Sequence, residues 1–301
     1  MKPLLLATSR LGRRLALASI ILLGGPPAMA IDVAPLWKYS DPAGSEQRFR
    51  DALATASGDD AIELQTQIAR TYGLRRRFDE ARRILAGIEP SIVRAGPAAQ
   101  VRYHLELGRT YASATHKADE ITPERREKAR AAYMTAFEKA KAARLDYLAL
   151  DALHMMVMVD SAPEAQLAWN EKAIAYMEAS SQGEARKWEG SLRNNVGYAY
   201  HLAGRYDEAI AQYRLSLAAH EREGRPANVR IAWWMIARTL RAQGKAEEAL
   251  AIQLRLEREW DAAGEPDPYV YEELEALYRQ AGDAARADAY AAKLKASRPA
   301  Q

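Results

Sequence analysis

Apolar residues recur at the spacing of an α-helix along most of the chain, and runs of alternating β-branched residues are absent. Short groups that contain glycine or proline separate the helical segments, because these residues interrupt helices. The groups are Gly58-Asp59-Asp60, Glu89-Pro90, Gly96-Pro97, Gly183, Gly224-Arg225-Pro226 and Gly264-Glu265-Pro266. The pattern predicts an all-α fold in which helices alternate with short turns.

A second pattern, longer than one helix, returns along the chain. Its clearest copy contains Gly197, Tyr200 and Gly204, and two further glycines follow at intervals of 40 and 38 residues, Gly244 and Gly282. We expect the last three glycines to end helices in a left-handed backbone conformation, which glycine adopts without steric cost. A period of this length is typical of stacked structural units that each pack on their neighbours.

These copies resemble tetratricopeptide repeats, which are helix-turn-helix units of about 34 residues. Six copies can be placed, and their first helices contain Ile68, Leu107, Ala149, Val196, Trp233 and Tyr271. The third copy departs most, because its first helix has neither the glycine nor the tyrosine of the pattern. The second helices of the others carry alanines that should allow close helix packing, namely Ala81, Ala129, Ala209, Ala249 and Ala287. The resemblance implies a right-handed superhelical α-solenoid of about 5–6 repeats, here of 38–40 residues.

The chain divides into four parts on this basis. Residues 1–30 are expected to be a cleaved signal peptide, 31–59 an N-terminal extension and capping helix, 60–297 the solenoid and 298–301 a C-terminal tail. Within the second part, residues 31–42 are expected to be extended and residues 45–57 to form one amphipathic helix.

The first thirty residues have the pattern of an export signal. Four basic residues precede an apolar run at residues 15–23, and the small-x-small sequence Ala28-Met29-Ala30 follows it. The run is too short for a membrane span, which needs about 20 apolar residues. We therefore expect a periplasmic protein, with secretion from the cell as the alternative.

Removal of this signal changes the charge of the chain. Of 43 basic and 40 acidic residues, four basic and no acidic residues lie in the signal, which leaves 39 against 40. A nearly neutral chain has no overall attraction to nucleic acid or to an anionic membrane. The chain also has no cysteine, which excludes disulfides, thiolate metal sites and a cysteine nucleophile.

No pattern of catalytic residues is evident. The chain has five histidines but no HExxH motif, no G-x-S-x-G sequence and no phosphate-binding glycine loop. Acidic pairs such as Asp79-Glu80 and Asp207-Glu208 are expected at helix starts, where they favour the positive end of the helix dipole. Arg75-Arg76-Arg77 is interpreted as a basic helix end, with a local anion site as the alternative. We expect a non-enzymatic protein that needs no metal or cofactor.

Residues 113–124 form an insertion that lengthens the turn inside the second repeat. A tolerated surface insertion is favoured over a functional loop. It ends in Thr122-Pro123, which should cap the helix that follows.

The resemblance also implies a binding surface, because the first helices of such repeats line a concave face. The repeat register places these residues there: Arg70, Arg109, His154, Asn194, Tyr198, His201, Trp234, Arg238 and Arg241. Arginines on one face suggest an acidic or carboxylate-bearing ligand. The alternative is that they pair with carboxylates of neighbouring helices, namely Glu63, Glu106, Asp151 and Glu272.

Two functions follow from this surface. The first is a scaffold or adaptor in the cell envelope that holds a protein or peptide segment in the concave groove. The second is a binding or sensing module for a small anionic ligand, which would need a closed pocket where the arginines converge. The oligomeric state, and whether the segment around Trp37 occupies the groove, stay open.

Overall fold

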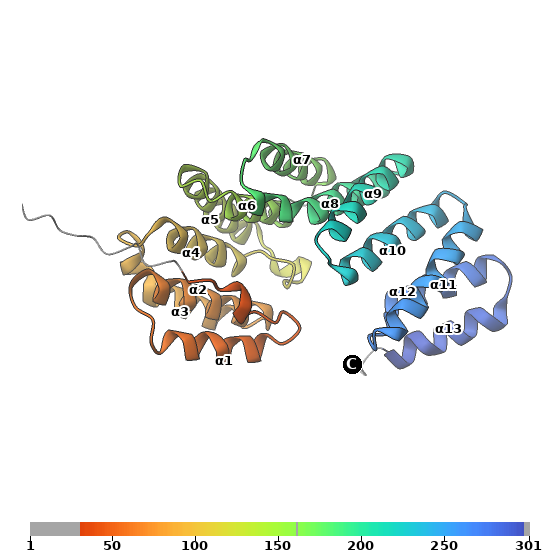
Figure 1. Ribbon diagram of the computed structural model, residues 1–301, viewed down its shortest axis with the longest axis horizontal. Helices are drawn as coiled ribbons and strands as arrows, with labels where there is room; N and C mark the ends of the chain where they lie inside the picture. Colours follow the sequence, from red (N-terminus) through yellow and green to blue (C-terminus); the bar gives the residue numbers. More distant parts are fainter. Residues whose placement is uncertain (1–30, 161, 298–301) are drawn as a thin grey trace, which may run out of the picture. The chain divides into compact units, whose positions relative to one another are not determined.

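The computed structural model describes residues 31–160 and 162–297, and the expected signal peptide and tail lie outside them. These residues form thirteen α-helices and three short 3-10 helices, without a strand (Figure 1). The prediction of an all-α helical-repeat solenoid is confirmed.

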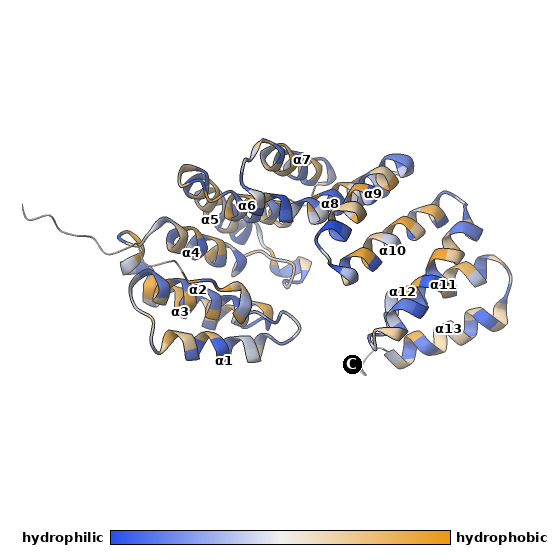
Figure 2. Cartoon of the chain, in the orientation of Figure 1, coloured by the Kyte–Doolittle hydropathy of each residue, from blue (hydrophilic) through white to orange (hydrophobic). Residues whose placement is uncertain are grey.

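Twelve of the helices form six consecutive pairs, one for each predicted repeat. The first helices are α2 (Gly58–Leu74), α4 (Pro97–Arg109), α6 (Asp146–Val159), α8 (Glu189–Leu202), α10 (Pro226–Ala242) and α12 (Pro268–Gln280). The second helices are α3 (Phe78–Ile92), α5 (Pro123–Ala142), α7 (Pro163–Ala179), α9 (Tyr206–Arg222), α11 (Ala246–Ala262) and α13 (Ala284–Ser297). Each helix contacts the next, α2 also contacts α4, and α4 contacts α6. Apolar positions gather on one side of most helices (Figure 2).

Small residues allow the two helices of a pair to approach closely. The five alanines predicted at these contacts are completely buried: Ala81, Ala129, Ala209, Ala249 and Ala287. Closely packed interiors leave no room for a larger side chain at such positions.

The turns within the pairs follow the predicted backbone. Gly204, Gly244 and Gly282 have φ angles of 72°, 82° and 76°. In the first repeat the equivalent position is Arg76, four residues after Tyr72, and its φ is also positive, at 61°. A side chain in this conformation costs roughly 1–2 kcal/mol.

One predicted break between helices is wrong. Glu89-Pro90 does not separate helices, because α3 continues through Pro90 to its last residue, Ile92. Ile88 and Ile92 lie one turn apart and are both buried, and this burial keeps the segment helical although Pro90 lacks a backbone donor.

The N-terminal region also differs from the prediction. The capping helix is α1 (Pro42–Leu53), which begins and ends earlier than residues 45–57. It begins at Pro42 because the Asp41 carboxylate caps it by accepting a hydrogen bond from the Gly44 amide. The segment expected to be extended contains the 3-10 helix η1 (Ala34–Leu36).

Candidate functional site: a cavity between three first helices

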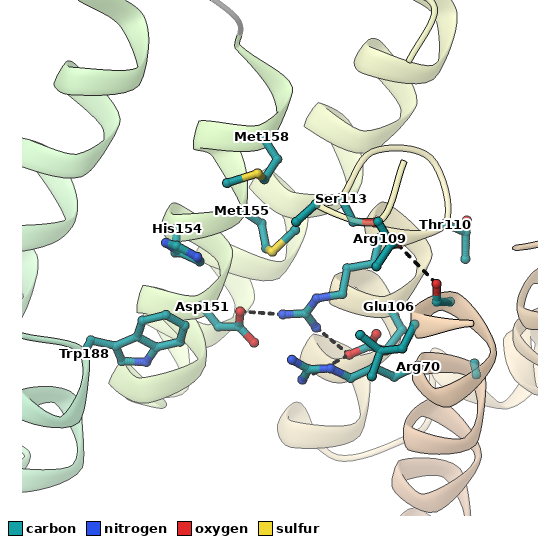
Figure 3. Close-up of a pocket in the computed structure, with 15 residues that line it drawn as sticks. Arg70, Glu106, Arg109, Thr110, Ser113, Asp151, His154, Met155, Met158 and Trp188 are labelled. Carbon is teal, nitrogen blue, oxygen red and sulfur yellow. Dashed lines mark hydrogen bonds and ion pairs between the residues drawn. The ribbon is translucent and has the colours of Figure 1, made fainter. Parts of the chain in front are cut away.

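A cavity of about 240 Å³ is lined by α2, α4 and α6, the first helices of three successive repeats (Figure 3). Three of the predicted site residues line it: Arg70 from α2, Arg109 from α4 and His154 from α6. The repeat register therefore brings these three side chains together. We call this space the α2–α4–α6 cavity.

Arg109 is the centre of a buried ion network at this cavity. Its guanidinium donates to Glu106 Oε1 and to Asp151 Oδ1, at 2.5 Å each (Figure 3). A buried charge needs such partners because desolvation otherwise opposes it. Burial alone would raise the pKa of Asp151, but Arg109 and then Arg70 outweigh it and lower that pKa. Both carboxylates are therefore paired inside the protein, as the second interpretation of the arginines expected.

Arg70 connects the cavity to the N-terminal extension. Its guanidinium lies 5.5 Å from the ring centroids of Trp37 and Tyr39, which stack on each other. Trp37 Nε1 in turn donates to Gln67 Oε1 of α2 at 3.0 Å. Cation–π contacts of this kind hold a guanidinium in place while leaving its N–H groups available.

A second hollow of about 530 Å³ adjoins the first and shares Arg70, Asp151 and Trp188 with it. Trp37 and Tyr39 form part of its wall. The segment around Trp37 therefore lies along the first helices. Its position relative to these helices could not be decided from the sequence.

The insertion at residues 113–124 forms another wall of the cavity. Ser113 and Thr115 line the cavity directly. Arg76 fixes this segment, because its guanidinium donates to the Thr115 carbonyl at 2.5 Å and to Glu120 at 2.6 Å. The prediction that Thr122 caps the next helix is confirmed by its hydrogen bond from the Arg125 amide. The insertion is therefore held against the first repeat and contributes to the lining of the cavity.

The remaining lining is apolar or aromatic. Met155, Met158 and Trp188 face the cavity (Figure 3). His154 Nδ1 lies 3.2 Å from Asn195 Nδ2, and burial lowers the pKa of His154, so that the ring is neutral at pH 7. The cavity therefore combines apolar and aromatic side chains with a charge-balanced group of ionised side chains.

The other six predicted residues do not line this cavity: Asn194, Tyr198, His201, Trp234, Arg238 and Arg241. Several of them surround a different carboxylate, Glu273 of α12, which accepts two hydrogen bonds from Arg241 at 2.7 and 3.0 Å. Arg238 lies 3.9 Å from the same carboxylate and stacks on Trp234 and Tyr198. Arg241, Arg238, Trp234 and Tyr198 thus form a second group, separate from the three residues at the cavity.

The three arginines at residues 75–77 also have acidic partners within the chain. Arg75 pairs with Glu46, Arg76 with Glu120 and Arg77 with Glu80. This pairing leaves little positive charge for a local anion site.

Sequence reasoning missed Trp188 as part of the site, and it left the roles of the Trp37 segment and of the insertion open. Trp188 ends the 3-10 helix η3 (Gly183–Trp188), which contacts both α6 and α8. In the sequence, Trp188 could have been noticed as an aromatic residue that does not belong to the repeat pattern. Within residues 31–160 and 162–297, no group of three or more histidine, aspartate or glutamate side chains is arranged to hold a metal. None of the helices described there is both long and apolar enough to span a membrane.

Comparison with known proteins places this fold. The family described as "Tetratricopeptide repeat" matches residues 188–258. No curated protein matches the chain in sequence.

Two solved structures are similar in fold. One is a signal transduction ATPase with numerous domains that has a tetratricopeptide repeat sensor, from Pyrococcus horikoshii, with a TM-score of 0.61 and 13% identity over 84% of this chain. The other is aspartyl phosphate phosphatase F from Bacillus subtilis, with a TM-score of 0.59 and 14% identity over 87% of this chain. The matches span only 38% of the first protein and 67% of the second. The family match shows that residues 188–258 contain tetratricopeptide repeats, and the six helix pairs and the similar structures show that the same helical-repeat fold extends over the described residues.

Proposed function

We propose that this protein is an exported scaffold that holds a segment of a partner protein at the α2–α4–α6 cavity, in the cell envelope. Tetratricopeptide repeats generally mediate interactions between proteins. The observation that supports this site is that both segments outside the repeat pattern meet the first helices nearby: the insertion lines the cavity, and the extension lines the hollow that adjoins it. Segments that depart from a regular repeat and are held in place at a hollow favour a binding role.

The size and charge of the site favour a protein segment over a small anion. Ligand pockets for whole small molecules are about 300–1,000 Å³, so a cavity of about 240 Å³ suits one side chain of a longer ligand. The adjoining hollow could take the residues beside it. Arg70 and Arg109 do converge, as a small anion would need, but Glu106 and Asp151 balance their charge. An acidic ligand gains little from such a site.

Site-specific photocrosslinking in cells would test the binding site. A crosslinking amino acid in place of Ala114, which is exposed and lines the cavity, should capture a protein partner. The matched control is Leu215 on α9, a second helix, where the side chain is 44% exposed. Equal capture at both positions, or no protein captured at Ala114, would reject the proposed site.

Export rests on residues 1–30 and is tested separately. We expect the mature protein to begin at Ile31 and to appear in the periplasmic fraction. Intact mass and cell fractionation measure both. A full-length chain that stays in the cytoplasm would reject export without affecting the binding site.

A further inference from the structure

Apolar side chains make up most of the surface that the α2–α4–α6 cavity presents to a ligand. Leu74, Met158 and Trp188 line it and are half-buried, so each keeps some apolar surface in contact with water. Met155 lines the cavity as well, one turn before Met158 on α6 (Figure 3). A ligand that covered these side chains would remove apolar surface from water, which is favourable.

Most polar side chains of the cavity already have partners inside the protein. The hydroxyl groups of Thr110 and Thr115 each donate to a backbone carbonyl, at 2.8 and 3.2 Å, and the Trp188 indole N–H does the same at 3.0 Å. The Ser113 hydroxyl lies 3.0 Å from that of Thr115. A polar ligand group would have to replace such bonds, so it gains little from this cavity.

The charges of the cavity disfavour a charged ligand group as well. Arg70 and Arg109 face Glu106 and Asp151, which gives two positive and two negative groups. A charged ligand group would lose its hydration in the cavity without a net opposite charge to replace it. The ligand group that gains most is therefore neutral and apolar.

The volume of the cavity suits an aromatic ring. An apolar cavity of about 150 Å³ can hold benzene. This cavity is about 240 Å³, which leaves room for the methylene group that joins a ring to the backbone. The side chains around it also favour a ring over an aliphatic chain, because methionine sulfur and other aromatic rings interact favourably with aromatic groups. Met155, Met158 and Trp188 supply these partners.

We propose that the cavity binds the side chain of a phenylalanine in the partner segment. This inference rests on the proposed function and specifies which residue of the partner the cavity selects. A tyrosine would bring a hydroxyl group that loses its hydrogen bonds to water where most polar groups are already paired. A leucine would fill less of the volume and would lack the contacts between sulfur and an aromatic ring. Phenylalanine therefore ranks above both.

The test uses pools of acetylated nonapeptides with one fixed central residue and the mature chain immobilised. The fixed residue is phenylalanine, tyrosine, leucine, glutamine, glutamate, lysine or alanine, and the flanking residues are random but exclude large apolar ones. We expect the phenylalanine pool to be retained at least about tenfold more than the alanine pool, because burial of the ring removes its apolar surface from water. The tyrosine and leucine pools should lie between them, and the glutamine, glutamate and lysine pools should not exceed alanine.

The other outcomes separate this inference from the proposed function. Equal retention of all pools, or strongest retention of any pool but phenylalanine, would overturn the inference while leaving peptide binding in place. Retention of no pool would overturn it too, and the photocrosslinking at Ala114 would then decide the proposed function by itself.

A second measurement places the ring in the cavity without any variant. In the mature chain with isotope-labelled methionine methyl groups, the phenylalanine pool should shift the NMR signals of Met155 and Met158, because an aromatic ring changes the magnetic field around it. The signal of Met235 on α10 should stay unchanged, since Met235 does not line the cavity. The leucine pool should cause much smaller shifts. Unchanged Met155 and Met158 signals would overturn the inference.

Two variants make the peptide test specific to the cavity. Met158→Gln makes one wall polar at nearly the same side-chain length, and the preference for phenylalanine over alanine should fall at least about threefold, because a polar wall gains less from the ring. Met134→Gln on α5 is the matched control, because Met134 is also half-buried but does not line the cavity. Equal preference in the two variants would overturn the inference. Circular dichroism checks that each variant folds, and if Met158→Gln does not, the methionine signals of the wild type decide.

Discussion

The ring of Tyr133 on α5 lies so close to Gly108 on α4 that a Cβ at Gly108 would be 2.5 Å from Tyr133 Cε1. The same contact recurs two repeats later, where a Cβ at Gly197 would be 2.6 Å from Tyr213 Cε1. Carbon atoms do not approach to this distance without a clash. The tyrosine of the second helix therefore requires a glycine on the first helix.

Substitution Gly108→Ala should consequently destabilise the protein by about 1–3 kcal/mol, since the added methyl group overpacks a fully buried contact. The matched control is Gly87→Ala in α3, where an added Cβ would meet no atom within 4 Å. It should stabilise by about 0.5–1 kcal/mol, because alanine favours a helix over glycine. Urea unfolding measures both. Equal effects of the two substitutions would show that the contact is not tight.

Substitution Arg109→Met should cost about 3–5 kcal/mol, because it leaves Glu106 and Asp151 buried without their cation. The control Arg238→Met should cost less than about 1 kcal/mol, because this side chain is 33% exposed and its ion pair is long. Denaturant unfolding of the two variants compares them. A mild effect of Arg109→Met would mean that water reaches the two carboxylates.

Stability should fall as the pH decreases below about 6.5. Burial lowers the pKa of all five histidines, and it lowers that of His104 to about 4. With the folded-state pKa below the unfolded value of about 6.5, the unfolded chain takes up protons first. The stabilisation is complete above pH 6.5 and is lost as the pH falls toward 4. For His104 alone this amounts to about 1–3 kcal/mol.

The variant His104→Gln isolates this contribution. Its stability should depend less on pH between 4 and 6.5 than that of the wild type, as followed by thermal unfolding across a pH series. An unchanged slope would place the pH dependence in other groups.

Substitution Arg76→Ala should release the insertion from the first repeat. It removes the hydrogen bonds to Thr115 and Glu120 but keeps a residue with a side chain at the same backbone position. Amide hydrogen exchange at residues 113–120 should become at least about tenfold faster, since these contacts hold the loop closed. Arg77→Ala is the control, because Arg77 pairs only locally with Glu80. Unchanged exchange would mean that the His116–Phe78 ring contact holds the loop instead.

The repeat architecture was predictable from the sequence because each unit repeats the same packing. Gly108 and Gly197 each face a tyrosine of the second helix, and the second-helix alanines are buried, so the spacing of these residues is visible without a structure. The convergence of Arg70, Arg109 and His154 follows from the same register.

The insertion, which lines the cavity, and the extension, which lines the adjoining hollow, were not predictable in this way. The extension and the insertion have no periodicity, and their positions depend on contacts such as Arg76 with Thr115. Which carboxylate pairs with each arginine was also uncertain, because neighbouring residues on a helix point about 100° apart. Arg241 therefore pairs with Glu273, whereas the sequence suggested Glu272.

At position 76, the stability of the fold and the proposed role of the α2–α4–α6 cavity favour different residues. Later repeats have glycine at this turn, and glycine would relieve the strain of the positive φ angle. Selection for stability alone would therefore replace Arg76 with glycine, and the cavity would lose the anchor of one wall. An arginine maintained there among homologues would mark those that keep the proposed binding site, and a glycine would mark those in which the repeat has lost it.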